Sequence, residues 1–544
     1  MAAELPIPIY TNLNDLYANL GTTLNHAERW NTLVEEFEKR YGRKPEYIAR
    51  APGRINVIGE HIDYALFGVL PTAVERDILI ACAPRSPAKD KEEAYGEVVA
   101  NNTHPKYTES QFVPEKKAHS SMFKGISDSE PGEDVVHVEQ WHLDIDTSQL
   151  RWESYIKAGY YGVLNNFFAP ADTDAKPVPM DMLVSGNLPS GSGLSSSAAM
   201  VVGSTLAFLA ANGKLEDANL TKGRLVEIAV ENEKRVGVNS GGMDQAASVI
   251  SQPGSVLYIT FYPKLSATPT SLPPRAVLVV ANSLVVADKA VSAKWCYNLR
   301  VVETLVGARI LARHLGVKLD DKEKVTYREV VGRLAEEKKG EEAGKGGGME
   351  ESRLKEAIQL VLNEVDHLKG RDEKDGEGVS MEEMIELSGL TADAFNELYL
   401  SWVEVEADNF KLYRRAKHVL SEALRVLEFS DICQKGESET VLQELGTLMN
   451  ESHKSCNDEF DCSCPELNEL TELARQSGAY GSRLTGAGWG GCCVSLVAED
   501  EVESFLQKMK AGYGRFKDLE GEALSEALFA TRPSSGACVF KYTE

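Results

Sequence analysis

The sequence predicts a fold that mixes helices and strands and is divided into two parts. Segments with apolar residues at helical spacing alternate along the chain with short apolar segments typical of strands. At 544 residues the chain exceeds the roughly 150 residues of a typical domain, so we expect two or three domains. The best candidate boundary is a turn region that contains Pro263, Pro269, Pro273 and Pro274.

The first part begins with a predicted amphipathic helix over 27–41, where Trp30, Leu33 and Phe37 recur at helical spacing. Residues 1–26 show no clear periodicity, and residues 86–133, rich in charge, Pro and Gly, predict surface loops. Further strands are expected at 47–50, 55–58, 77–82, 135–143 and 180–184, and further helices at 153–168, 197–211 and 222–235.

The remaining elements follow the same two patterns. Strands are predicted at 256–261, 276–281, 480–485, 493–497 and 537–542, and helices at 297–315, 440–452, 465–476 and 499–510. The stretches 335–350 and 374–378 are rich in Lys, Glu and Gly and poor in apolar residues, which predicts a flexible charged insertion near 335–380.

Composition excludes several classes of function. A net charge of −25 argues against direct binding of nucleic acid, which depends on Lys and Arg neutralising phosphates. No run approaches the ~18 consecutive apolar residues of a membrane span, and no secretory signal is visible. Nine cysteines, an odd number, suit a reducing compartment, so we expect a cytoplasmic protein. The spacing of His453, Cys456, Cys462 and Cys464 fits no common zinc pattern.

The segment 189–199, PSGSGLSSSAA, has the composition of a loop that holds phosphate. Gly191 and Gly193 allow a sharp backbone bend or a close approach to a ligand. Ser195, Ser196 and Ser197 place hydroxyl groups at the start of a helix, whose N-terminus carries partial positive charge and unpaired N–H donors. No Lys follows the last glycine, so this is not a Walker loop. Taken alone, the segment fits a Ser-capped helix after a flexible loop equally well.

Two other segments place polar or glycine-rich loops beside apolar structure. In 51–71, APGRINVIGEHIDYALFGVLP, the side chains of Arg54, Glu60, His61 and Asp63 follow a Pro-Gly turn within ten residues. Arg forks toward phosphate oxygens, and carboxylates and His offer hydrogen bonds to a ligand's hydroxyl groups. The segment 485–493, TGAGWGGCC, leads directly into an apolar strand. Three such loops favour a binding or catalytic site over a purely structural role.

These three segments resemble the three signature motifs of the galacto-, homoserine, mevalonate and phosphomevalonate (GHMP) kinases, and GRINVIGEHIDY resembles the galactokinase branch. The resemblance runs in order from about residue 41 to residue 497. It implies an α+β, two-lobed fold with the active site between an N-terminal domain (27–262) and a C-terminal domain (275–544). It also implies transfer of the γ-phosphate of ATP to the C1 hydroxyl of α-D-galactose, the entry step of galactose breakdown, with Mg²⁺ as cofactor.

The resemblance further implies roles for individual residues. Asp244, in VGVNSGGMDQAAS, would take or orient the proton of the C1 hydroxyl, and Arg54 would stabilise the transition state. Residues implied to contact or pack on the sugar are Arg54, Glu60, His61, Asp63, Gly241, Asp244 and Tyr297. Residues implied to bind ATP are Gly191, Gly193, Ser195, Ser196, Ser197, Asp288 and Lys289.

The family pattern also supplies two Mg²⁺ ligands, a Ser from the phosphate loop and a Glu from the helix before the catalytic Asp. Ser197 and Glu233 match these positions best, with Glu231 as a competing neighbour. The loop 486–491 would support the phosphate loop through its backbone shape rather than through a catalytic side chain.

Two alternatives remain open at this point. An N-acetylgalactosamine kinase would share the EHIDY pattern, although Gly191-Ser192-Gly193 stands where such relatives tend to carry Ser-Ser-Gly. A sensor with weak or no kinase activity would bind galactose, ATP and then a transcriptional repressor; some such sensors lack the pair that Ser197-Ala198 forms here.

Overall fold

A computed structural model of the chain describes residues 2–16, 20–85, 95–122, 135–147, 149, 151–168, 175–189, 191–237, 241–286, 292–337, 348–370, 378–436 and 438–542. The two short strands expected around the Pro-Gly turn form one long strand, β2 (Tyr47–Ile58). Its pairing with β3 (Leu70–Pro84) shifts register between Pro52 and Arg54, so a bulge accommodates the proline that cannot donate to the ladder.

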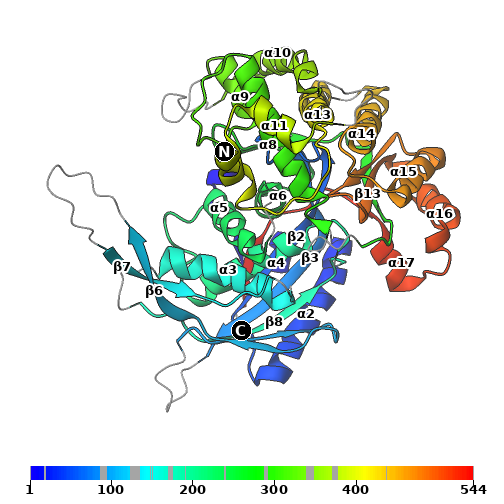
Figure 1. Cartoon of the computed structure of the whole chain (residues 1–544). Coiled ribbons are helices and arrows are strands. Elements are labelled where there is room, and N and C mark those ends of the chain that lie inside the picture. Colours follow the sequence, from blue (N-terminus) through cyan, green and yellow to red (C-terminus); the bar gives the residue numbers. More distant parts are fainter. Residues whose placement is uncertain are drawn as a thin grey trace.

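A sheet of seven strands forms the N-terminal lobe, in the order β1-β15-β2-β3-β8-β4-β5 (Figure 1). The other strands of this sheet are β1 (Ile9–Tyr10), β15 (Cys538–Lys541), β8 (Met180–Gly186), β4 (Val98–Asn102) and β5 (Ser110–Phe112). Two hairpins accompany it: β6 (Glu115–Met122) with β7 (Val135–His142), and β9 (Ser255–Thr260) with β10 (Ser266–Ser271).

Alternate residues of β3 face two different hydrophobic clusters. Leu79 and Ala81 pack with Phe37 of α2 (Leu20–Tyr41), which confirms the predicted amphipathic helix. Ile78 and Ile80 face the larger cluster, to which the helices on the other side of the sheet contribute (Figure 1). Those helices are α3 (Trp152–Phe167), α4 (Ser196–Ala211), α5 (Lys222–Glu233) and α6 (Met243–Ile250).

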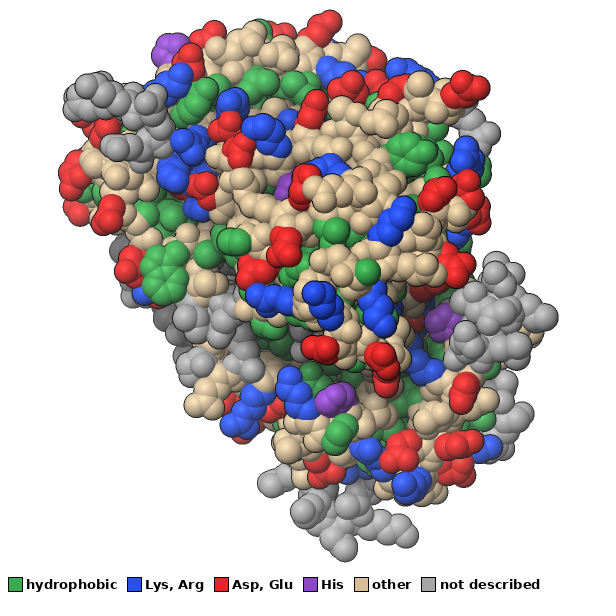
Figure 2. Space-filling model, turned by 90° about the vertical axis from the view of Figure 1, so that its right-hand side faces the viewer, with side chains coloured by type: hydrophobic (Ala, Val, Ile, Leu, Met, Phe, Trp, Pro, Cys, Tyr) green, Lys and Arg blue, Asp and Glu red, His purple; other side chains and the backbone are tan. Residues whose placement is uncertain are grey.

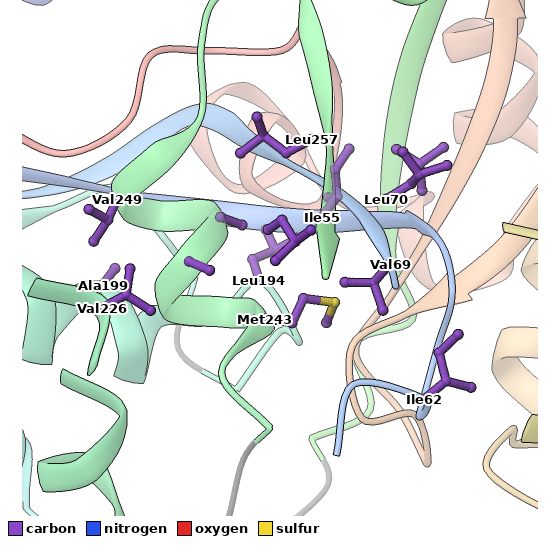
Figure 3. Close-up of a cluster of buried hydrophobic side chains, with 14 of the residues drawn as sticks. Ile55, Ile62, Val69, Leu70, Leu194, Ala199, Val226, Met243, Val249 and Leu257 are labelled. Carbon is purple, nitrogen blue, oxygen red and sulfur yellow. The ribbon is translucent and has the colours of Figure 1, made fainter. Parts of the chain in front are cut away.

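The larger cluster also forms the floor beneath the predicted site. Leu194 of the phosphate loop and Met243 at the start of α6 lie beside Ile55 of β2 and Leu257 of β9 (Figure 3). All four side chains are buried. The loops that carry the motifs therefore rest on a packed apolar base.

The C-terminal lobe combines a four-stranded antiparallel sheet, in the order β12-β13-β11-β14, with helices. The strands are β12 (Gly481–Thr485), β13 (Cys492–Ala498), β11 (Ala276–Asn282) and β14 (Leu528–Thr531), and the helices beside them are α14 (Val441–Asp458), α15 (Pro465–Ser477), α16 (Val502–Gly512) and α17 (Gly521–Ala527). A second group of helices lies at the top of Figure 1: α8 (Tyr297–His314), α9 (Tyr327–Leu334), α10 (Glu351–Leu362), α11 (Met381–Ser388), α12 (Ala392–Phe395) and α13 (Leu412–Lys435).

The domain boundaries differ from those expected. The N-terminal lobe starts before residue 27, because β1 joins its sheet, and it also receives the end of the chain: β15 inserts between β1 and β2. The backbone N–H groups of Gly536 and Ala537 donate to Ser251 and Ser248, which fastens this returning segment to α6. The C-terminal lobe is therefore not the whole of 275–544.

Three other expectations are corrected. The stretch 86–133 holds β4, β5 and β6 as well as loops, and the proline-rich turn region contains β10, paired with β9. Within 335–380, α10 is an ordered helix whose Ile358 and Val361 are fully buried. The rest of the predicted insertion includes 338–347 and 371–377, which lie outside the described residues. No helix in the described part of the chain is long and apolar enough to cross a bilayer.

Candidate active site

A cavity of about 830 Å³, including its open mouth, lies where the loops of the two lobes meet. Its walls come from the end of β2 and the loop after it, the start of α6, the start of α8 and the loop between β12 and β13. Predicted site residues in this lining are Arg54, Glu60, His61, Asp63, Asp244 and Tyr297. The structure thus brings four segments that are distant in sequence to one cavity.

Asp244 is held from two sides at the edge of this cavity. Arg54 donates from Nε to one carboxylate oxygen at 2.7 Å, and the Ser195 hydroxyl donates to the other at 2.6 Å. Arg54 also donates from Nη1 to the Gly193 carbonyl at 2.6 Å. The predicted catalytic pair and the phosphate loop therefore form one hydrogen-bonded unit.

The phosphate loop has the backbone shape that its glycines predicted. Gly191 and Gly193 adopt φ of 72° and 79°, and Ser195 also lies in the left-handed region at 59°. Ser195 is the N-cap of α4 but directs its hydroxyl to Asp244 instead of capping the helix. The first N–H groups of α4 have no partner within the helix, so they are available to an anion.

A second cavity, of about 1400 Å³ with its open mouth, adjoins the start of α4. Gly191, Ser196 and Ser197 contribute to its wall. The same wall holds residues that sequence reasoning missed, which are basic or aromatic: His104, Lys106, Tyr107, Arg151, Trp152 and Tyr155. Figure 2 shows Lys and Arg side chains, with Asp and Glu side chains among them, around a recess between the larger and smaller parts of the molecule. Lys106 and Arg151 therefore bring positive charge to this wall, which Glu526 also lines, on a chain whose net charge is −25.

The third motif supports the phosphate loop through backbone contacts. A Cβ on Gly486 would lie 2.6 Å from the Gly193 carbonyl oxygen, and one on Gly491 would lie 2.8 Å from that of Ser192. Both glycines have positive φ. Only glycine fits such an approach of two backbones, as expected from the family resemblance.

The Glu60 side chain is buried between the lobes, where it accepts hydrogen bonds from a backbone N–H group and from an arginine. Its Oε2 accepts from the Gly486 N–H at 3.1 Å and from Arg483 at 3.3 Å. Burial raises the pKa of Glu60 to about 7, against the opposing charges of Arg483 and Arg54. The carboxyl therefore titrates near neutrality, while its contacts hold it in place at the cavity wall.

His61 holds loops together in addition to lining the cavity. Its Nε2 bonds to the Ala487 carbonyl at 2.9 Å, and its Nδ1 to the Tyr64 hydroxyl at 3.2 Å. Burial lowers the pKa of His61 to about 3, so the ring is neutral, with Nε2–H as donor and Nδ1 as acceptor. Both nitrogens are thus engaged within the protein, and the ring centroid lies 5.7 Å from those of Tyr297 and Trp489.

Asp63 and Gly241 fit closely against each other. Asp63 accepts backbone hydrogen bonds from Tyr64 and Met243, and burial, followed by the charge of Asp244, raises its pKa to about 6. A Cβ on Gly241 would lie only 2.4 Å from a carboxylate oxygen of Asp63. The absence of a side chain at 241 is therefore required by the position of Asp63.

Trp489 is a cavity residue that sequence reasoning did not identify. Its backbone N–H donates to the Cys462 carbonyl at 2.7 Å and its indole Nε1–H to the Asp461 carbonyl at 2.9 Å. The residue has φ of 54°, an unusual conformation for a bulky side chain. The sequence did offer one signal for a site residue here: Trp489 is the sole aromatic residue of the glycine-rich segment 485–493.

The cavity wall is tied to a helix that the sequence analysis did not predict. Glu422 of α13 accepts from the backbone N–H groups of Gly59 at 2.9 Å and Glu60 at 3.3 Å. His418, one turn earlier, bonds to the Glu60 carbonyl at 3.0 Å. Arg425 and Ser452 bond to the Glu422 carboxylate, whose pKa falls to about 2 because these partners and Arg483 outweigh burial.

Two oxygen-bearing side chains proposed for Mg²⁺ lie near the second cavity. Ser197 lines it. Glu233 is buried and accepts from Gln245 at 2.5 Å, and its charge adds to burial in raising the pKa of Tyr155, another residue of that wall. A hydroxyl and a carboxylate are the oxygen ligands that Mg²⁺ prefers, so the donor set fits. Asp288 and Lys289 lie outside the described residues.

Comparisons with known proteins agree with this arrangement. Family models described as the galactokinase galactose-binding signature, the GHMP kinase N-terminal domain and the GHMP kinase C-terminal region match residues 35–84, 155–252 and 438–515. The chain is 33% identical to a galactokinase of Dictyostelium discoideum, with 98% of each chain covered, and 33% identical to one of Saccharomyces cerevisiae, with 95% covered.

A likeness in fold accompanies these matches. The structure of Lactococcus lactis galactokinase complexed with galactose superposes with a TM-score of 0.59, covering 93% of this chain and 99% of that one at 21% identity. The two lobes, the phosphate loop and the extent of the sequence matches lead to one assignment. The chain belongs to the galactokinase family of the GHMP kinases.

Proposed function

We propose that this chain transfers the γ-phosphate of ATP to the C1 hydroxyl of α-D-galactose, giving galactose 1-phosphate and ADP. The observation that carries the proposal is the position of Asp244. It lines the cavity that Arg54, Glu60 and Asp63 also line. It also accepts a hydrogen bond from Ser195, the N-cap of α4, whose first residues line the second cavity. An acceptor hydroxyl at Asp244 and a phosphate at the N-terminus of α4 would therefore be neighbours.

The residues around Asp244 suit phosphoryl transfer. Asp244 accepts the hydrogen bond of the C1 hydroxyl and orients its oxygen toward the γ-phosphorus, and its carboxylate is the group that takes or directs the proton. Arg54, fixed by Asp244 and the Gly193 carbonyl, places a permanent positive charge where negative charge gathers on the transferring phosphoryl group. The O1–phosphorus bond forms as the bond to ADP breaks.

ATP binding is assigned to the second cavity. The phosphates lie at the N-terminus of α4, and Lys106 and Arg151 add positive charge to the same wall. Mg²⁺, held by Ser197 and Glu233, supplies charge neutralisation on the phosphates when bound. The cytoplasm is the proposed compartment, supported by nine cysteines that are all free thiols.

Selectivity for galactose is assigned to Glu60 and Asp63. Both carboxyl groups are buried at the cavity wall, with defined hydrogen-bond partners. A sugar with a hydroxyl in the wrong configuration would leave one of them without its partner, which is strongly unfavourable for a buried polar group.

An ADP-release assay with galactose, N-acetylgalactosamine or no acceptor tests this function. Galactose-dependent ADP release is expected, and Asp244→Asn should lower kcat by about 10²–10⁴-fold while galactose binding is retained. Asp217→Asn, an exposed position in the same lobe, is the matched control. Turnover with N-acetylgalactosamine alone, or tight galactose binding without turnover, would instead support the amino-sugar kinase or the repressor-binding sensor.

A further inference from the structure

Two imidazoles and one carboxylate converge at the far end of α8 from the active site. His314 is the last residue of α8, whereas Glu364 and His367 lie at the turn that includes η4 (Val365–Leu368). One nitrogen of each ring and a carboxylate oxygen all lie within 4.8 Å of one another. Tyr297, at the start of α8, is about 26 Å away along the helix, so this cluster is separate from the catalytic cavity.

The distances within the cluster match those between ligands of a small metal ion. His314 Nε2 lies 3.1 Å and His367 Nδ1 lies 3.5 Å from the same Glu364 oxygen, Oε2. Ligands at 2.0–2.2 Å from a tetrahedral ion are roughly 3.3–3.6 Å apart. The two rings stack with centroids 3.4 Å apart, and one nitrogen of each ring lies beside the same carboxylate oxygen. The rings turn on binding, so that the lone pairs of both nitrogens converge on the ion.

The neighbouring charges leave the cluster accessible to a cation. Arg313, adjacent to His314, donates to the Leu387 carbonyl at 2.6 Å, and Lys369 pairs with Asp366 at 2.6 Å. All three candidate ligands are partly exposed to solvent, by 34% to 50% of their side chains, so water can complete the coordination.

One existing contact must change when an ion binds. His367 Nδ1 lies 3.1 Å from the Glu364 carbonyl, where it acts as a donor. A neutral imidazole carries its proton on either nitrogen, so the proton moves to Nε2 and Nδ1 becomes a ligand. The exchange needs no change in the net charge of the ring.

We propose that His314, Glu364 and His367 form a surface site for a divalent transition metal of the zinc class. Two imidazole nitrogens with one carboxylate favour Zn²⁺, Co²⁺ or Ni²⁺ over Mg²⁺, which prefers oxygen ligands and retains its water. Because His314 and Glu364 are 50 positions apart, the bound ion links the end of α8 to the segment after α10. It braces the helical group of the C-terminal lobe and takes no part in phosphoryl transfer.

The test is Zn²⁺ binding by the full chain in excess Mg²⁺, measured by calorimetry, together with the absorption spectrum of the Co²⁺ form. We expect the double variant His314→Ala/His367→Ala to bind one equivalent of Zn²⁺ fewer than the wild type and to lose its d–d bands. Zn²⁺ should raise the Tm of the wild type and of the control His142→Ala, a histidine of β7, but not that of the double variant.

Glu364→Gln provides a second, milder test, with Zn²⁺ affinity expected to fall at least tenfold while Tm in the presence of a chelator stays unchanged. Kinase activity without Zn²⁺ should be the same in all variants. Equal Zn²⁺ stoichiometry and affinity in the wild type and the double variant would overturn the proposal, since the ion would then be bound elsewhere, for example by cysteines. Displacement of Zn²⁺ by an equal concentration of Mg²⁺ would overturn it as well.

Discussion

Replacement of Glu422 by Gln tests whether α13 holds in place the loop of Gly59 and Glu60, which is proposed to bind the sugar. The Glu422 carboxylate is buried, accepts the N–H groups of Gly59 and Glu60, and pairs with Arg425. Its pKa falls from the usual 4.5 to about 2 in the folded chain. At about 1.4 kcal/mol per pKa unit, this shift corresponds to roughly 3 kcal/mol of stability at neutral pH. The value agrees with the ~3–5 kcal/mol typical of a broken buried ion pair.

The lowered pKa of Glu422 also predicts the direction in which its contribution to stability changes with pH. The folded pKa of Glu422 lies below the unfolded one, so its stabilisation is fully present above about pH 4.5 and is lost as the pH falls toward 2. The stability difference between the wild type and Glu422→Gln should therefore be about 3 kcal/mol at pH 7 and should shrink below pH 4.5. Urea titrations followed by tryptophan fluorescence at several pH values measure it.

Galactose binding provides the second readout. With the loop of Gly59 and Glu60 less firmly held, we expect the Kd for galactose to rise about tenfold or more, equivalent to ~1.4 kcal/mol. Glu428→Gln, the same substitution at an exposed position of α13, is the control and should leave both stability and Kd unchanged. If Glu422→Gln behaved like Glu428→Gln at pH 7, the proposed link between α13 and the sugar loop would be wrong.

Three further substitutions follow from the geometry. Gly193→Ala should raise the KM for ATP in steady-state kinetics, because φ of 79° is unfavourable by ~1–2 kcal/mol for a residue with a Cβ; an unchanged KM would argue against a role in phosphate binding. Glu337→Ala should lower the unfolding midpoint by breaking its buried bidentate pair with Arg328, worth ~3 kcal/mol or more, whereas Glu356→Ala on the surface of α10 should not. Trp489→Ala should raise the KM for galactose more than it lowers kcat, because the side chain lines the cavity wall and its indole N–H is bonded to the Asp461 carbonyl; an effect confined to kcat would contradict this.

The N-terminal lobe was largely predictable because its patterns are local. Trp30, Leu33 and Phe37 fall on one helix face, and the serines of 195–197 stand at a helix start, as both patterns indicated. The short strands β4, β5 and β6 were missed because charge and turn residues surround them. The helix α13 was not predicted, and nothing in the sequence indicated that its buried His418 and Glu422 would bond to the backbone of Gly59 and Glu60.

By itself, the sequence determined the chemical groups available at each loop. Segment 189–199 supplies glycines, which allow a sharp backbone bend, and hydroxyl groups at a helix start. Segment 51–71 supplies an Arg and two carboxylates. Only the tertiary structure decided which of these groups meet. Arg54 bonds to Asp244 across 190 positions and Asn56 to Thr485 across 429, and the last strand crosses back into the first lobe. The physical reason is that hydrogen bonds over such separations depend on how whole sheets and helices pack, whereas helix and strand patterns report only on neighbours along the chain.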